Sequence, residues 1–146
     1  MPRHTETRTL PYTPEQMYEL VADVARYPEF LPWTAAARIR SREGTAPEVM
    51  LADLVISFKV FRESFGSRVK LWPGENRIET EYLDGPFKFL KSEWTFEPAP
   101  GGCTVGFWID YEFRNALIGR VVGSVFNTAM QRVVAAFETR ASKLYG

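Results

Sequence analysis

Histidine and cysteine are nearly missing from this chain, which contains one of each, His4 and Cys103. A single cysteine excludes an internal disulfide and any metal site built from a cysteine cluster. His4 lies near an N-terminus that is expected to fray, and no Ser-His or Cys-His arrangement for nucleophilic catalysis can be assembled around it. The sequence therefore predicts a protein that is not an enzyme and that carries no metal and no cofactor.

An excess of charge of either sign is also missing, because eighteen basic and eighteen acidic residues cancel. This balance disfavours a protein that holds nucleic acid by bulk charge, and it leaves a local basic patch open. The chain begins without the apolar run of a signal peptide, and no later run is long enough to cross a bilayer. We expect an intracellular, cytoplasmic protein, with peripheral contact at the inner face of the membrane as a further alternative.

Apolar residues, by contrast, are plentiful, at 45% of the 146 residues, and aromatic residues make up 14%. A chain of this length buries roughly two-thirds of the surface that its unfolded form exposes. Residues 1–146 are therefore expected to form one domain with a large core.

The last stretch, residues 115–146, predicts one long helix, because its apolar residues recur at steps of three and four. Asn115 is expected to cap its start, and at 1.5 Å per residue the helix would be about 45 Å long. We expect its apolar residues to form one wide stripe that requires a large cover. They are Leu117, Ile118, Val121, Val122, Val125, Phe126, Ala129, Met130, Val133, Val134, Phe137, Ala141 and Leu144.

The N-terminal part predicts a short strand over residues 5–10 and then a helix that begins at Thr13. The sequence Thr13-Pro14-Glu15-Gln16 has a threonine cap, a proline at the first helical position and a glutamine three residues on, which together form a capping box. Pro28 and Pro32 are expected to break the helix that follows. This break would gather apolar and aromatic side chains on a short bent element, namely Tyr27, Phe30, Leu31 and Trp33.

Between residues 34 and 113 the apolar period changes to two, which is typical of half-buried strands. Turn residues interrupt the alternation at Glu43-Gly44, Pro73-Gly74, Asp84-Gly85-Pro86 and Pro100-Gly101-Gly102. The fold class is therefore α+β, with a curved antiparallel sheet of about six to seven strands around the C-terminal helix. Because a helix about 10 Å across cannot fill the concavity of such a sheet, space remains that aromatic side chains plug or an apolar ligand occupies.

Several blocks of the sequence resemble those of coenzyme Q-binding proteins and of bacterial ribosome-association toxins. The blocks are LPYTPEQMYELV at 10–21, YPEFLPW at 27–33, DGPFK at 84–88, WTF at 94–96, DYEF at 110–113 and VAAFE at 134–138. The resemblance covers nearly the whole chain, and the Pro32-Trp33 pair and the C-terminal block are closer to the coenzyme Q-binding branch. It implies a START-like helix-grip fold of the polyketide cyclase and lipid-transport type.

The same resemblance implies a non-enzymatic binding or carrier protein for a polyprenyl quinone such as ubiquinone, which supports respiratory electron transport or quinone biosynthesis. The alternative is a toxin-like protein that binds the large ribosomal subunit through its surface. An enzyme of the cyclase type is a third class, which the missing acid-base set disfavours. The sequence does not predict an oligomeric state.

The residues expected to line the ligand site are aromatic or aliphatic, and core packing is the alternative for each of them. They are Phe30, Leu31, Trp33, Leu54, Phe65, Leu90, Trp94, Phe96, Tyr111, Phe126, Met130, Val133 and Phe137. Lys88 is a candidate contact for the ligand head group, or else a solvated lysine. Glu63 follows the apolar alternation and could face inward, whereas a bulge or an edge position would return it to water.

Overall fold

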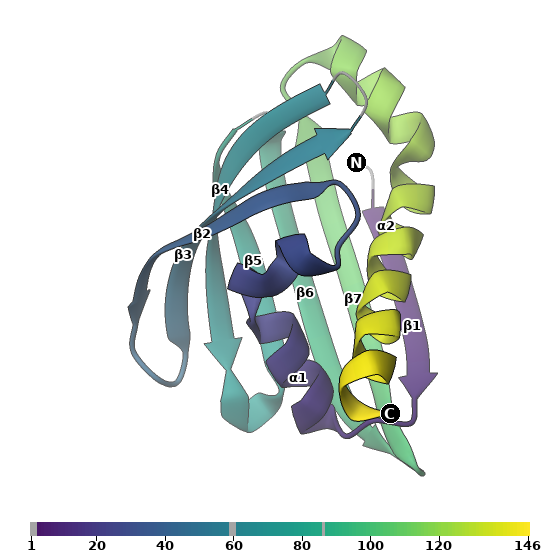
Figure 1. The fold of residues 1–146 in the computed structure, drawn as a ribbon. Helices are drawn as coiled ribbons and strands as arrows, with labels where there is room; N and C mark the ends of the chain where they lie inside the picture. Colours follow the sequence, from purple (N-terminus) through teal and green to yellow (C-terminus); the bar gives the residue numbers. More distant parts are fainter. Residues whose placement is uncertain (1–2, 59–60, 86) are drawn as a thin grey trace.

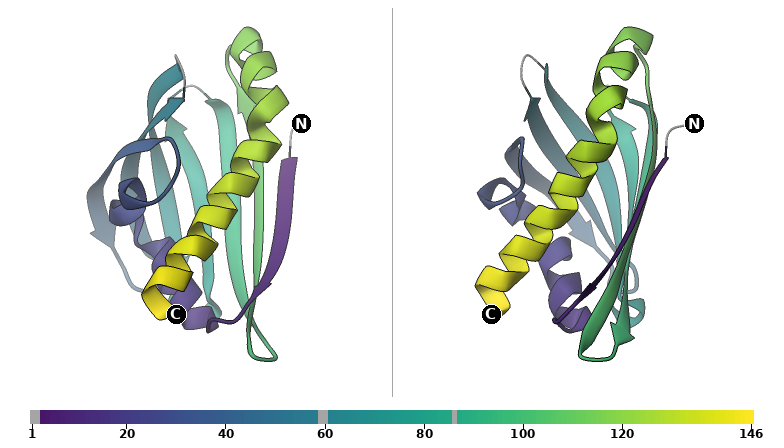
Figure 2. Two further views of the ribbon diagram at one scale, coloured as in Figure 1. Left: turned by 45° about the vertical axis from the view of Figure 1, so that its right-hand side comes forward. Right: turned by 90° about the vertical axis from the view of Figure 1, so that its right-hand side faces the viewer.

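The computed structural model describes residues 3–58, 61–85 and 87–146 of the chain. In these residues the strands form one seven-stranded antiparallel sheet in the order β1-β7-β6-β5-β4-β3-β2, and the long helix α2 crosses its concave face (Figures 1 and 2). The elements are β1 (Arg3–Leu10), α1 (Pro14–Ala22), the 3-10 helix η1 (Val24–Glu29), β2 (Thr34–Glu43), β3 (Glu48–Phe58), β4 (Phe61–Trp72), the 3-10 turn η2 (Pro73–Glu75), β5 (Arg77–Asp84), β6 (Phe87–Ala99), β7 (Gly102–Phe113) and α2 (Ala116–Tyr145). This arrangement confirms the predicted α+β helix-grip class.

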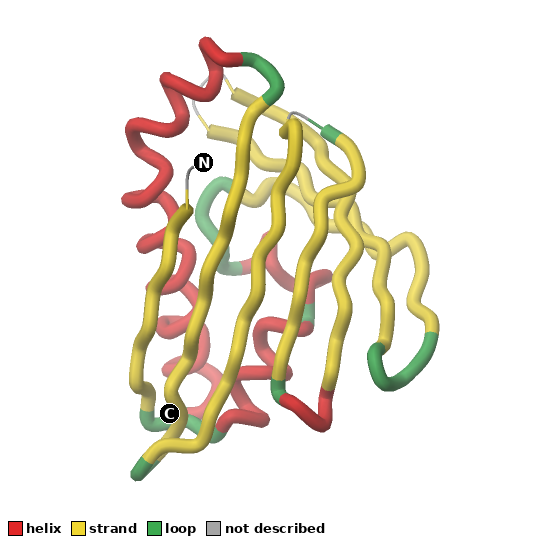
Figure 3. The backbone as a smooth tube through the Cα atoms, turned by 180° about the vertical axis from the view of Figure 1, so that it is seen from behind, coloured by secondary structure: helices red, strands yellow, loops and turns green. Residues whose placement is uncertain are grey.

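Hairpins join the strands from β2 to β7, so that neighbours in the sequence are also neighbours in the sheet. Gly44 and Gly101 have positive φ angles of 79° and 77° at two of the predicted turns. The N-terminal strand β1 instead pairs with β7, with Arg3 opposite Asp110 and Leu10 opposite Cys103. Seen from behind, the convex face of the sheet carries none of the described helices (Figure 3).

Side chains accept hydrogen bonds from the backbone N–H groups in the first turn of both α-helices, as the sequence predicts. The Thr13 side chain accepts a hydrogen bond from the Gln16 backbone N–H, and the Gln16 side chain accepts one from the Thr13 N–H. The Asn115 side chain accepts bonds from the backbone N–H groups of Leu117 and Ile118. These bonds satisfy backbone donors that a helix start otherwise leaves unpaired.

The prediction of a single apolar stripe along α2 is wrong for the first turns of the helix. Leu117 is 68% exposed and Val121 is 66% exposed, whereas Phe126 and Phe137 are buried. Leu117 and Phe126 are nine residues apart, which is 2.5 turns at 3.6 residues per turn, so they point to opposite sides. Leu144, in the last turn, is also exposed. The side chains of Val122 and Val125 lie outside the described part of the chain.

The concave face differs between the two ends of the sheet. At the lower end α1 packs on β5, β6 and β7, and apolar side chains from helix and sheet are fully buried there, as Met17, Leu71 and Phe96 show. At the upper end, where α2 begins, Phe87, Tyr111 and Phe113 are buried, but several other apolar side chains of the sheet are only partly buried. This partly exposed region, called here the upper concave face, comprises Leu54, Phe65, Tyr82 and Leu90 of the sheet with Met130 and Val133 of α2.

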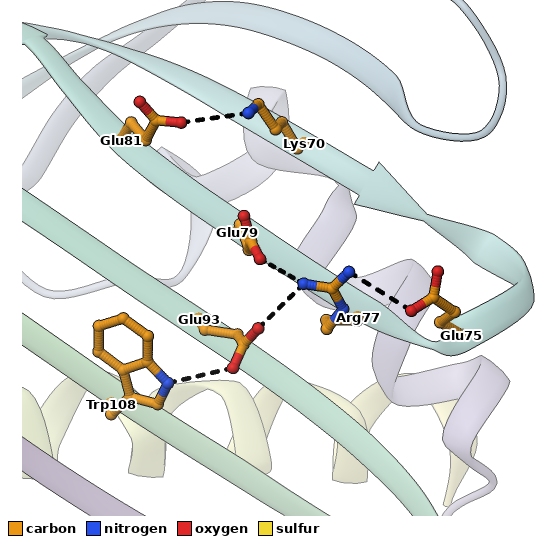
Figure 4. A network of polar contacts seen from close by, with 7 residues as sticks. All are labelled: Lys70, Glu75, Arg77, Glu79, Glu81, Glu93 and Trp108. Atoms are coloured by element: carbon orange, nitrogen blue, oxygen red, sulfur yellow. Dashed lines mark hydrogen bonds and ion pairs between the residues drawn. The ribbon is translucent and has the colours of Figure 1, made fainter.

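Charged side chains on the convex face are largely paired with one another (Figure 4). Arg77 contacts Glu75, Glu79 and Glu93, and the Glu93 carboxylate also accepts a bond from the Trp108 indole N–H at 3.1 Å. A short distance away, Lys70 lies 3.3 Å from Glu81. Such pairs contribute little stability individually, but they neutralise the cations of the central strands.

The expectation that His4 frays with the N-terminus is wrong. His4 is only 7% exposed, because β1 extends to Arg3 and its inner side chains lie against α2. Its Nδ1 lies 3.3 Å from Asn127 Oδ1, and its Nε2 lies 3.7 Å from a Glu6 carboxylate oxygen. Pairing with β7 along all eight residues of β1 holds this strand in place.

Candidate functional site

The predicted lining residues fall into two groups in the structure. Five aromatic residues are buried, namely Trp94, Phe96, Tyr111, Phe126 and Phe137. The other eight, Phe30, Leu31, Trp33, Leu54, Phe65, Leu90, Met130 and Val133, are partly buried. The second group includes every residue of the upper concave face except Tyr82, so the accessible apolar surface lies there.

The buried aromatic residues hold α2 against the sheet. The Trp94 ring lies 4.4 Å from the Phe107 ring and 5.1 Å from the Phe137 ring, measured between centroids. Nearer the upper end, the Tyr111 and Phe126 rings stack with their centroids 3.8 Å apart. These two clusters join β6 and β7 to both halves of the helix, and such ring pairs add stability beyond the area that they bury.

The segment between η1 and β2 contacts the C-terminal half of α2. The Phe30 ring packs edge-on against the Phe137 ring, with 5.3 Å between the centroids. The guanidinium carbon of Arg140 lies 5.0 Å from the centroid of the same Phe30 ring. Trp33 has a φ angle of 61°, a left-handed conformation that is costly for a bulky residue. The Ser57 backbone N–H donates to the Trp33 carbonyl at 2.8 Å and ties this segment to the end of β3.

Three hydroxyl groups lie on the concave face, and two of them, those of Thr80 and Ser92, were not assigned as site residues from the sequence. Thr80 and Ser92 are directly opposite each other on β5 and β6, and Tyr111 lies on the neighbouring strand, opposite Leu90. None of the three hydroxyls has a side-chain hydrogen bond in the described residues. Ser92 and Tyr111 are buried as residues, but their hydroxyl oxygens are not among the enclosed side-chain atoms that lack a partner, so solvent still reaches them. Burial raises the pKa of the Tyr111 phenol, so this hydroxyl stays protonated and able to donate. The signal was present in the alternation, where polar residues interrupt the otherwise apolar inner positions.

The two charged candidates lie in different places. Lys88 is 71% exposed and its ammonium is 3.6 Å from a Glu112 carboxylate oxygen on the convex side. Glu63 pairs with Ile56 across β3 and β4 and has the same parity as the inward residue Phe65. Glu63 is therefore on the concave side of the sheet, half-buried beside the upper concave face.

A separate pocket of about 170 Å³ opens between α1, η1 and the last turns of α2. Arg140 lines this pocket, and its guanidinium donates a hydrogen bond of 2.8 Å to Glu29 Oε1. The buried Nε of Arg140 has no hydrogen-bond partner in the described residues. The lining residues are Glu19, Leu20, Asp23, Arg26, Phe30, Arg140, Leu144 and Tyr145. Phe30 separates this pocket from the aromatic cluster around Phe137.

Within the described ranges no group of three or more His, Cys, Asp or Glu side chains could hold a metal ion. No described helix combines the length and apolar character that a membrane crossing requires. What the chain offers is a curved sheet that grips a long helix and keeps a partly exposed apolar surface with a few hydroxyl groups. These features define a helix-grip protein in which a partly exposed apolar surface lies between sheet and helix.

Residues 10–138 match the profile of the family described as polyketide cyclase / dehydrase and lipid transport. The chain belongs to this family. It is 37% identical over 141 residues to the ribosome association toxin RatA of Rickettsia prowazekii, and the match covers 94% of both chains. It is 30% identical to the mitochondrial coenzyme Q-binding protein COQ10 homolog B of Xenopus laevis, over 98% of this chain and 59% of that protein.

A solved structure resembles this chain over its whole length. The 18 kDa protein CC1736 from Caulobacter crescentus is 36% identical, with a TM-score of 0.84, and the match covers 100% of this chain and 99% of that one. The comparisons thus confirm the predicted family and the START-like fold. The relatives carry names of both the quinone-binding and the ribosome-association kind, and the family description includes cyclases and dehydrases beside lipid transport.

Proposed function

We propose that this protein is a non-enzymatic carrier for a polyprenyl quinone, which it binds on the upper concave face. The observation that carries the proposal is the combination of partly exposed apolar side chains with three unpaired hydroxyls on one face. A quinone has the same two parts, an apolar tail and a ring with two carbonyl oxygens. Hydroxyl donors from Thr80, Ser92 and Tyr111 suit those oxygens, because a hydroxyl that has no protein acceptor can donate to a carbonyl of the ligand.

The apolar part of the ligand would supply most of the affinity. Burial of apolar surface contributes about 25 cal/mol per Å², so an aromatic wall holds an isoprenoid without many polar contacts. A domain of this length has a radius of gyration of roughly 15 Å, which is too small to enclose a long polyprenyl tail. The ring and the first isoprene units would therefore lie inside, and the rest of the tail outside. Lys88, on the convex side, takes no part in this arrangement.

Ribosome association is the second candidate, and the names of several relatives favour it. Its physical support is the charge of α2, which has four basic residues and one acidic residue. A surface that binds rRNA acts through such cations, and it does not require the hydroxyls on the concave face.

The hydroxyl groups provide the first test. We expect the double variant Thr80→Val with Ser92→Ala to bind a short-chain ubiquinone roughly thirtyfold more weakly, because the ligand loses two donors worth about 1 kcal/mol each. Quenching of indole fluorescence during titration measures the affinity, since Trp94 lies on the same face. An isoprenoid hydrocarbon without the ring should bind equally well before and after the change.

Thr104→Val is the matched control, because Thr104 lies on the outer side of β7. Equal quinone affinity in the double variant, the control and the unchanged protein would contradict the assigned head-group contacts. Absence of quinone binding by the unchanged protein, with copurified lipid already removed, would contradict the carrier function itself.

A further inference from the structure

The first turns of α2 expose apolar side chains that the core does not use. Leu117 is 68% exposed and Val121 is 66% exposed, and they lie one turn apart on the solvent side of the helix. Strand β5 ends at the upper end of the molecule, where α2 begins (Figure 1), and Leu83 in its last residues is 36% exposed. Apolar side chains on the side of a helix that faces away from the core form an exposed apolar surface, which is typical of an interaction site.

Positive charge surrounds this apolar turn. Arg114 and Arg120 are both exposed and lie on either side of Leu117 in the sequence. No acidic residue occurs between Glu112 and Glu138, and Glu112 is itself paired with Lys88. In the described residues Arg120 has no ion-pair partner. The helix dipole adds further positive potential at this end.

We propose that residues 114–121 dock on an anionic lipid surface, with Leu117 and Val121 at the acyl boundary and Arg114 and Arg120 among the phosphate groups. Exposed leucine and valine favour lipid over RNA, because a phosphate backbone offers them nothing to bury against, whereas cations beside apolar residues suit an anionic bilayer. Docking here places the lipid beside the upper concave face. The inference rests on the proposed function for its purpose, since a quinone would then pass from the membrane directly to its site.

The test uses quinone-free vesicles of phosphatidylcholine, with and without about one-third phosphatidylglycerol, and the full-length chain. We expect sedimentation with the anionic vesicles, and a roughly tenfold weaker association for the double variant Leu117→Gln with Arg120→Gln. The matched control is Leu144→Gln with Lys143→Gln, which removes one exposed leucine and one exposed cation from the other end of the same helix. This control should sediment like the unchanged protein.

Loading with a soluble short-chain quinone, measured without vesicles, separates this inference from the carrier function. Loss of sedimentation with normal loading supports docking by the start of α2. Equal sedimentation of both double variants, or no sedimentation of the unchanged protein, overturns the docking surface whatever the loading result. If rRNA fragments compete with the vesicles and Arg120→Gln alone accounts for the loss, the surface binds nucleic acid and the lipid proposal fails.

Discussion

At the scale of single residues, two glycines in predicted turns differ in what surrounds them. A Cβ atom built on Gly102 would lie 1.8 Å from the Leu10 carbonyl oxygen and 2.9 Å from the Pro11 Cα. A Cβ atom on Gly74 would meet nothing within 4 Å. The difference arises because the end of β1 lies directly beside the start of β7 in the sheet, whereas the β4–β5 turn is exposed to solvent.

We therefore expect Gly102→Ala to destabilise the protein by about 1–3 kcal/mol or more, since backbone atoms of β1 would have to move. Gly74→Ala, the matched control, should change the free energy of unfolding by no more than about 0.5 kcal/mol. Urea unfolding followed by circular dichroism measures both. Equal stability of the two variants would show that β1 does not press on β7 as the structure has it.

At the scale of elements, the two halves of α2 have different roles. The C-terminal half is anchored by Val134, Phe137 and Ala141, all buried, whereas the N-terminal half exposes Leu117 and Val121. Phe137 alone contacts the rings of Tyr27, Phe30 and Trp94. The stability of the helix should thus be concentrated in its second half, which leaves the first half available for function.

Phe137→Ala is expected to lower the free energy of unfolding by about 3–5 kcal/mol, because it opens a cavity where three aromatic rings meet. Leu117→Ala removes an apolar side chain from an exposed position, and we expect it to change the free energy of unfolding by no more than about 0.5 kcal/mol. Thermal or urea unfolding of both variants tests the prediction. A larger effect at Leu117 would reverse the assignment of the anchoring half.

At the scale of the whole molecule, the net charge is zero, but positive and negative charge are unevenly distributed between α2 and the rest of the chain. Helix α2 has a net charge of +3, so the remainder of the chain has −3. On the convex face Lys70 and Arg77 are paired with carboxylates, whereas Arg120 and Arg132 on α2 have no ion-pair partner in the described part. A surface-binding function, whether for lipid or RNA, would act through α2, and a carrier function would act through the interior.

The substitution Val133→Trp distinguishes a function in the interior of the protein from a function of its surface. Val133 is half-buried on the sheet-facing side of α2, so a larger side chain fills ligand space and destabilises the protein by about 1–3 kcal/mol through overpacking. A carrier should lose quinone loading, with little dependence on salt. Ribosome binding should instead fall steeply with salt and remain nearly unchanged in the variant.

Complementation of a strain that lacks the native protein supplies the deciding measurement. We expect the folded Val133→Trp variant to fail in restoring respiration. Full complementation without quinone loading would contradict the carrier function and favour the surface function.

Local patterns in the sequence were sufficient for much of the fold, because capping, strand alternation and turn residues act over a few neighbouring positions. The capping box at Thr13, the cap at Asn115 and the turn glycines Gly44 and Gly101 all follow from such patterns. The inner face of each strand also followed, since period two places alternate residues on one face. These features depend on backbone geometry that every chain shares.

Tertiary structure alone decided which of these residues remain accessible. Pairing of β1 with β7 buries His4, and it makes Gly102 indispensable while Gly74 stays free to change. The approach of α2 to the sheet buries Phe126 and exposes Leu117, although both belong to one apolar helix. Contacts between distant segments set these outcomes, and local periodicity has no information about distance across the fold. For the same reason the sequence determined the family and the fold class, while the juxtaposition of the hydroxyl groups on the concave face emerged only when β5, β6 and β7 lay side by side.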